Sequence, residues 1–326
     1  MNCPARTACF ALLAIVGVVS GSAVAQQSTY PAKPVRFIIP VPPGGGADLL
    51  ARAVGQKLTE TWGQTVVIDN RGGAGGTIAV DMAAKAAPDG HTIVMGLIAS
   101  IAVNVSLIKL PYDPVADFAP ITLLAVAQNL LVVHPSLPAA SVRELIALLK
   151  SKPGHFNYAS AGNGTSPHLS AELFKLMTGA SMNHVPYKGA GPALVDLVGG
   201  QVGIYFGSLP ATLPQVRTGK LRVLAVSGSR RSQIVPDLPT VAEAGVPGFE
   251  SNQWYGVLAP AKTPAWIVNQ LNRDIITVLK LPEVRDRLSS QGFEVVANSP
   301  ADFGRYIREE IAKWAKVIKQ AGIRAN

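Results

Sequence analysis

Short apolar runs alternate along the chain with segments whose apolar residues recur every three or four positions. The apolar runs predict strands at residues 35–41, 66–68, 91–97, 123–126, 130–133, 156–159, 202–206 and 221–226. The other pattern predicts helices at residues 49–58, 77–87 and 141–150, another from residue 166, and a mainly helical last quarter. Strands that alternate with helices pair in parallel through crossover connections, so we expect an α/β protein with largely parallel sheets.

The length of the chain, 326 residues, is enough for two domains. The sequence has no low-complexity linker and no tandem repeat, so ordered crossover strands must join the domains. We place the crossings near residues 125 and 251. The predicted domains are therefore residues 26–125 plus 252–326, and residues 126–251.

The first 25 residues have the pattern of a secretory signal peptide. Arg6 precedes an apolar run over residues 8–19, and a small-x-small triplet at residues 23–25 follows. The run is shorter than the ~20 residues that span a bilayer, which makes a membrane anchor the weaker alternative. Cleavage after Ala25 would remove both cysteines, and export without disulfides fits a bacterial periplasm.

Charge and motifs argue against several classes of function. Lys and Arg number 29 against 20 acidic residues, a net charge of +9, but the basic residues are scattered. Nucleic-acid binding requires a basic stripe or patch, so we expect no nucleic-acid partner. The five histidines lack metal-ligand spacing, and the common nucleotide-binding, metalloprotease and serine-hydrolase motifs are absent. We therefore expect no metal, no cofactor and no catalysis.

A glycine-rich loop, Pro42–Asp48, connects a predicted strand to a predicted helix. Its three consecutive glycines let a ligand approach the backbone, and the unpaired N–H groups of the helix start favour an anion. An ordinary tight turn would also need glycine and remains the alternative. Asp48 would repel an anion, so we expect it to cap its own helix or to accept from a ligand amine, hydroxyl or water.

A second small polar loop, Ser160–His168, also leads from a predicted strand into a helix, in the other half of the chain. Two helix starts that face one cleft would suit a ligand with two anionic ends. His168 could donate to a carboxylate, or it could be a cap or surface residue.

Several motifs occur in the order found in one protein family. They are Tyr30–Arg36 with Pro42–Gly45, Val67–Gly76, Ala87–Gly90, Leu110–Pro114, Asn157–Ser160, His184–Gly189 and Pro239–Gly245. Over essentially the whole chain after the leader, the sequence resembles the receptors of tripartite tricarboxylate transporters, the Bug family. The resemblance implies periplasmic receptors similar to type II periplasmic binding proteins, with two α/β domains, a hinged cleft and small organic acids as ligands.

The resemblance also implies which residues hold the ligand, largely through backbone groups and ordered water. By position these are Pro43, Gly44, Gly45 and Asp48 in the first domain, and Ser160, Gly162, Thr165 and His168 in the second. The family often has an aromatic residue where Val41 stands. Its Asp or Ser after the strand ending at Phe206 corresponds to Gly207 and Ser208, which leaves no acidic partner for a ligand amine.

Further pocket candidates are Ser100, Asn104, Tyr187 and Trp254. Each has a structural alternative, a turn or cap role for the first two and core packing for the aromatic residues. Lys188 could balance an anionic ligand or could be an exposed amine.

The combined expectation is a monomeric periplasmic receptor that captures a carboxylate by cleft closure and delivers it to the membrane permease subunits of a tripartite transporter. An orphan sensor that presents the ligand-bound protein to a signalling partner would use the same receptor. A secreted hydrolase or isomerase with an oxyanion hole is the enzyme alternative, but the sequence lacks a nucleophile–base motif.

Overall fold

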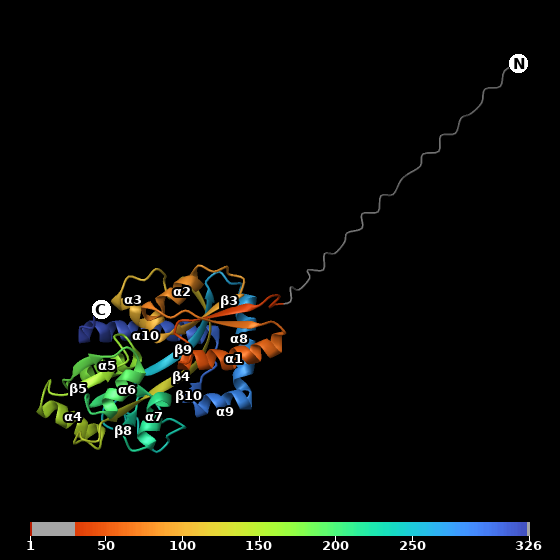
Figure 1. Cartoon of the computed structure of the whole chain (residues 1–326). Coiled ribbons are helices and arrows are strands. Elements are labelled where there is room, and N and C mark those ends of the chain that lie inside the picture. Colours follow the sequence, from red (N-terminus) through yellow and green to blue (C-terminus); the bar gives the residue numbers. More distant parts are fainter. Residues whose placement is uncertain (2–29, 325–326) are drawn as a thin grey trace. The chain divides into compact units, whose positions relative to one another are not determined.

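One long strand, β4 (Phe118–Val133), belongs to both halves of the sheet (Figure 1). The structure is a computed structural model that describes Met1 and residues 30–324. The predicted leader and its cleavage after Ala25 lie outside the described residues, apart from Met1. No helix in the described part of the chain is long and apolar enough to cross a membrane.

The first half of the sheet pairs with the N-terminal part of β4. Its strands are β1 (Val35–Ile39), β2 (Val66–Asn70), β3 (Thr92–Leu97), β9 (Asn252–Pro260) and β10 (Phe293–Val295). β1 lies parallel between β2 and β3, whereas β9 runs antiparallel between β3 and β4. The helices are α1 (Gly46–Trp62), α2 (Thr77–Ala84), α3 (Asn104–Leu107), α8 (Ala265–Lys280), α9 (Pro282–Ser290) and α10 (Pro300–Ala321), with a 3₁₀ turn at Ala74–Gly76 and a π-helical segment at Ile98–Val103.

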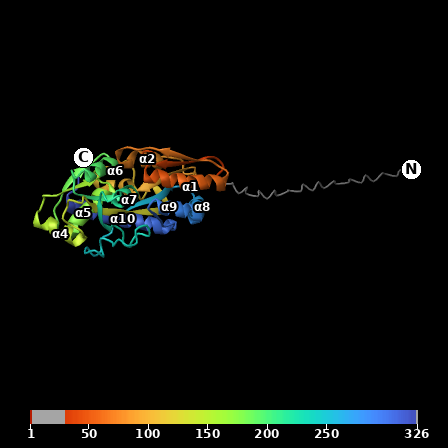
Figure 2. The ribbon, with the colours of Figure 1, turned by 60° about the horizontal axis from the view of Figure 1, so that its bottom comes forward.

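The second half of the sheet pairs with the C-terminal part of β4. Its strands are β5 (Asn157–Ser160), β6 (Asn183–Pro186), β7 (Ile204–Ser208) and β8 (Arg222–Val226), and its helices are α4 (Val142–Ser151), α5 (Ser166–Thr178), α6 (Ala190–Val198) and α7 (Leu209–Arg217). β5 is parallel to β6 and β7, and both β7 and β8 run antiparallel to β4. Figures 1 and 2 show α4 and α5 of this half far from α8, whereas α10 of the first half extends alongside α5.

β4 replaces two strands that the sequence predicted separately, at residues 123–126 and 130–133, and the predicted break was wrong. The polar residues Gln128 and Asn129 lie between the two predicted strands, and both are buried in β4. Gln128 Nε2 donates to Glu294 Oε1 (2.6 Å), and Asn129 Nδ2 donates to Ser166 Oγ (2.8 Å). Because these side chains find protein partners in place of water, the strand continues through them.

The α/β fold class is confirmed, although the sheet is mixed rather than largely parallel. Parallel pairs occur within the strand–helix–strand units of each half, as the alternating pattern predicts. β4 and β9, which lie at the centre of the sheet, pair antiparallel with each other and with their neighbours.

Helix α10 covers one face of β9 and leaves the other face open to the site. Trp254 of β9 is fully buried against α10, where its Nε1 donates to Glu310 Oε2 (3.1 Å) and its ring meets Phe303 edge-on. Residues alternate between the two faces of a strand, so Gln253 and Tyr255 point the opposite way from Trp254. The packing of α10 therefore determines which β9 side chains are available to a ligand.

Candidate functional site

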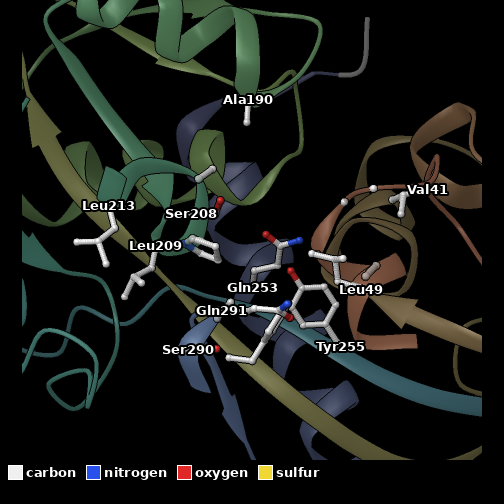
Figure 3. Close-up of a pocket in the computed structure, with 18 of the residues that line it drawn as sticks. Val41, Leu49, Ala190, Ser208, Leu209, Leu213, Gln253, Tyr255, Ser290 and Gln291 are labelled. Atoms are coloured by element: carbon white, nitrogen blue, oxygen red, sulfur yellow. The ribbon is translucent and has the colours of Figure 1, made fainter. Parts of the chain in front are cut away.

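A cavity of about 660 Å³ lies where the starts of α1 and α7 approach β9 (Figure 3). Most of its lining side chains are apolar, and among the described lining residues Arg217 is the one charged side chain. Such a cavity, large and apolar with a few polar groups, is typical of a small-molecule site. The polar side chains named in the figure are Ser208, Gln253, Tyr255, Ser290 and Gln291.

The start of α1 contributes Gly44–Ala47 to one wall of the cavity. Gly45 is the N-cap residue, and no side chain caps this helix start, so its first N–H groups are open to a ligand. Gly44 has a φ of +88°, a conformation that favours glycine, and a side-chain carbon on Gly45 would meet no protein atom within 4 Å. The glycine loop thus presents a bare, uncapped helix start to the cavity, which is the arrangement that binds anions.

Asp48 does not line this cavity but holds the loop beside it. Its side chain is buried, and Oδ2 accepts from the backbone N–H of Gly44 (2.9 Å) and from Arg52 Nε (3.0 Å). Burial by itself would raise the pKa of Asp48, but the hydrogen bonds from Arg52 and Gly44 outweigh it and lower the pKa. The carboxylate is therefore ionised and matched by Arg52. Pro43, next to Gly44, is exposed and does not line the cavity either.

The opposite wall is formed by the starts of α7 and α6. Ser208, Leu209 and Ala211 come from the start of α7, and Ala190 is the first residue of α6. Neither helix has a side-chain cap at its N-terminus. Figure 3 shows Ala190 and Ser208 across the cavity from Val41 and Leu49. Three uncapped helix starts therefore face one space, and their dipoles together favour a negatively charged ligand.

Gln253 and Tyr255 of β9 form the floor between these walls and were missed by the sequence reasoning. Trp254, which the sequence offered as a pocket candidate, belongs to the core on the other face. A strand predicted at residues 252–257 would have identified Gln253 and Tyr255, because side chains alternate between the two faces of a strand. With Trp254 in the core, the residues before and after it point to the opposite face. Gln291 and Phe293, after α9, complete the floor.

The second glycine loop does not line this cavity, and several of its polar groups are hydrogen-bonded within the loop or to His184. Ser160 Oγ contacts His184 Nε2 (2.6 Å) and accepts from the backbone N–H of Gly162 (3.1 Å). Thr165 Oγ1 donates to the carbonyl of Gly162 (2.6 Å). A backbone hydrogen bond from Gly189 to Ala161 (3.2 Å) joins the loop to the start of α6, which does reach the cavity.

His168 lines a different cavity of about 350 Å³, beside Glu172, Lys175 and the end of α10. Its ring is buried and stacks on His184, with ring centroids 4.0 Å apart, and its Nδ1 accepts from the backbone N–H of Gly164 (3.0 Å). Burial, with the nearby charges of His184 and Lys175, lowers the pKa of His168 to about 3. His168 is therefore neutral at physiological pH and holds the loop from behind.

The remaining candidates also lie away from the larger cavity. Ser100 is fully buried in the π-helical segment, with its Oγ 3.4 Å from the carbonyl of Leu97, and Asn104 Nδ2 donates to the carbonyl of Gly75. Tyr187 donates its hydroxyl to Asp196 Oδ2 (2.8 Å). Of the ligand-binding residues expected from the sequence, the structure thus brings together Gly44, Gly45 and Ser208 in the larger cavity. Within the described residues, no group of His, Cys, Asp or Glu side chains is arranged to hold a metal ion.

A family model described as tripartite tricarboxylate transporter family receptor matches residues 50–323. The chain belongs to this family. Protein BugT of Bordetella pertussis is 40% identical over 317 residues, which cover 95% of this chain and 97% of BugT. The solved structure of R. palustris Rpa4515 with adipate is 41% identical, with a TM-score of 0.81, and the match covers 90% of this chain and 99% of that one. MatC from Rhodopseudomonas palustris with bound malate is 35% identical, with a TM-score of 0.77 and coverage of 89% and 100%.

Val41 and Ser208 of this tripartite tricarboxylate transporter receptor both line the cavity. Gly207, which precedes Ser208, does not line it. The wall at Val41 is therefore aliphatic. Because Ser208 is uncharged and Asp48 is paired with Arg52, the described lining offers no carboxylate to a ligand amine.

Proposed function

We propose that this protein is an extracytoplasmic solute receptor that holds a small organic acid in the cavity between α1, α7 and β9. The observation that carries the proposal is the meeting of three uncapped helix starts at a cavity without an acidic residue in its described lining. Backbone N–H groups and helix dipoles stabilise a carboxylate at such a place, and Arg217 adds a positive charge to the lining. The relatives solved with adipate and with malate support the same class of ligand.

The ligand contacts in this proposal are the backbone N–H groups from Gly45 onward and the hydroxyl of Ser208. Gly44 lines the cavity beside them, but its own N–H donates to Asp48. Asp48 supports the first loop by its hydrogen bond to Gly44, and Ser160, Thr165 and His168 give the second loop its shape. Their part in binding is then to hold backbone groups in place.

Binding is proposed to close the cleft between two domains, residues 26–125 plus 252–326 and residues 126–251. The pairing of β4 supports this boundary. β4 pairs with β9 up to Gln128 and with β7 from Asn129 onward. An acid that contacts α1 on one side and α7 on the other stabilises the closed state more than the open state, which is sufficient to drive closure.

The membership in a transporter-receptor family supports a transport role without catalysis. We propose export to the periplasm with cleavage after Ala25, action as a monomer, and delivery of the acid to membrane permease subunits. The receptor would then give the transporter its ligand selectivity.

A thermal-shift and calorimetry screen tests the proposal with malate, adipate, citrate and benzoate, and with glucose as the neutral control. At about 100 times its dissociation constant, a true ligand adds ~2.7 kcal/mol to the free energy of unfolding. Succinate and aspartate form a matched pair that differs by an ammonium group, and we expect the aspartate to bind more weakly because the lining has no acidic partner for it. Stabilisation by glucose with no response to any acid would reject the carboxylate assignment.

A further inference from the structure

The hydroxyl of Tyr255 is a polar group without a partner at the edge of the cavity. The residue is 3% exposed, and its side chain lines the cavity (Figure 3). A side-chain carbon built on Gly46 would lie 3.1 Å from the Tyr255 oxygen, so this oxygen stands directly against the first turn of α1. None of the hydrogen bonds found among the described residues involves this hydroxyl, although the residue as a whole is buried. The oxygen is open to the cavity, so its partner there can be a bound ligand or water.

The ring that carries this hydroxyl is held by its strand and by one aromatic neighbour. Tyr255 lies in β9 between Leu97 of β3 and Ala125 of β4. Its ring meets Phe293 edge-on, with centroids 5.3 Å apart and planes at 75°. A ring held in this way costs little conformational entropy when its hydroxyl binds a ligand. Burial also raises the pKa of Tyr255, so the hydroxyl is a proton donor throughout the physiological range.

A carboxylate at the start of α1 would meet both kinds of donor at once. The uncapped N–H groups at Gly45 and beyond approach it from the helix, and the Tyr255 hydroxyl approaches it from β9. An O–H group that donates to a carboxylate makes a charge-assisted hydrogen bond, which is about twice as strong as a neutral one. A ligand that covers the hydroxyl and offers no acceptor would displace water from it and leave it unpaired, which penalises that ligand.

We propose that Tyr255 is the side chain that recognises the carboxylate of the ligand, by donating its hydroxyl to an oxygen held at the start of α1. This inference rests on the proposed function and assigns a specificity-determining residue to it. The neighbouring Gln253 lies on the same face of β9 and also lines the cavity, so it faces the part of the ligand next to the carboxylate. The ligand is then an acid whose body is uncharged and mainly apolar, in keeping with the lining.

The test compares wild-type protein with Tyr255→Phe by calorimetric titration with adipate, malate and benzoate. The substitution keeps the ring and its contacts with Phe293 and removes only the oxygen. We expect the dissociation constant of the acid that binds most tightly to rise about tenfold to a hundredfold, as for a lost hydrogen bond to a charged group. We expect the melting temperature without ligand to stay unchanged, because the hydroxyl has no protein partner to lose.

Tyr187→Phe is the matched control. Its hydroxyl donates to Asp196 and lies outside the cavity, so this variant should lose some stability and keep its affinity. If Tyr255→Phe binds the acid as tightly as wild type, the inference is wrong while the proposed function stands. If Tyr255→Phe loses affinity together with several degrees of melting temperature, the hydroxyl is structural and the inference is equally wrong. If wild type binds none of the acids, the proposed function fails and the inference fails with it.

Discussion

At Gly45, the lack of a side chain leaves space for the ligand and is not required by the backbone conformation. Its φ of −82° and ψ of 170° suit any amino acid, and a side-chain carbon there would point into open space. Gly45→Val should therefore fold, with a loss of at most about 1 kcal/mol because valine is a poorer N-cap residue than glycine. It should lose binding of the acid at least tenfold, because the valine methyl groups occupy the place of the ligand. Chemical denaturation and calorimetric titration measure the two quantities separately.

Gly63 at the other end of α1 provides the control for this prediction. It has a φ of +64°, where a side chain strains the backbone, and it lies outside the cavity. Gly63→Ala should cost about 1–2 kcal/mol of stability and leave the affinity unchanged. Gly45→Val with normal affinity would remove the glycine loop from the site.

His168 gives the receptor a stability that depends on pH. The folded state holds the pKa of His168 at about 3, against the ordinary histidine value of 6.5, so the unfolded chain takes up the proton first as the pH falls. The contribution is complete above pH 6.5 and is lost progressively between pH 6.5 and 3, at up to about 1.4 kcal/mol per pH unit. In urea denaturation at a series of pH values, His168→Gln should lose stability less steeply over this window than wild type. Equal slopes in the two proteins would show that His168 does not stay neutral in the fold.

At the scale of elements, the sequence predicted most of the strands, but it missed β6, β9, α6 and α7 and divided β4 where polar residues are buried. Most predicted strands fall within a few residues of observed ones, because apolar runs reveal buried strands directly. Gln128 and Asn129 broke the predicted pattern, and their partners Glu294 and Ser166 are distant in sequence. Local patterns carry no information about such partners, so the long strand β4 could not be foreseen.

The sequence likewise predicted only part of the candidate site. Helix starts after glycine loops can be read from the sequence, and Gly44, Gly45 and Ser208 were found in this way or through the family resemblance. Whether the backbone N–H groups of such a loop face the cavity or bond to the protein itself depends on residues that are distant in the sequence. In the second loop, backbone N–H groups donate to His168 and Ser160 and are not free for a ligand. Ser160 in turn contacts His184. Gln253 and Tyr255 were missed because the strand that orients them was not predicted.

At the scale of the whole molecule, the cavity exists because segments far apart in the chain meet at β9. The starts of α1 and α7 lie in different halves of the sheet, on either side of the point where β4 changes its pairing partners. The affinity of a ligand that contacts the starts of both α1 and α7 depends on the distance between the two halves. Since differential contact is what shifts a two-state equilibrium, we expect an acid that bridges the walls to favour a closed state.

Closure should therefore be visible as a change in size. In small-angle X-ray scattering of wild-type protein, the radius of gyration should decrease when the acid identified by calorimetry is added to saturation, and glucose should leave it unchanged. Gly45→Val should keep the larger radius at the same acid concentration, because it lacks the contact on the α1 side. If the acid binds wild type with normal stoichiometry and the radius stays constant, the halves do not move and the receptor holds its ligand in a preformed site. The coupling between α1 and α7 would then be absent, and the transporter would have to recognise the loaded receptor by something other than closure.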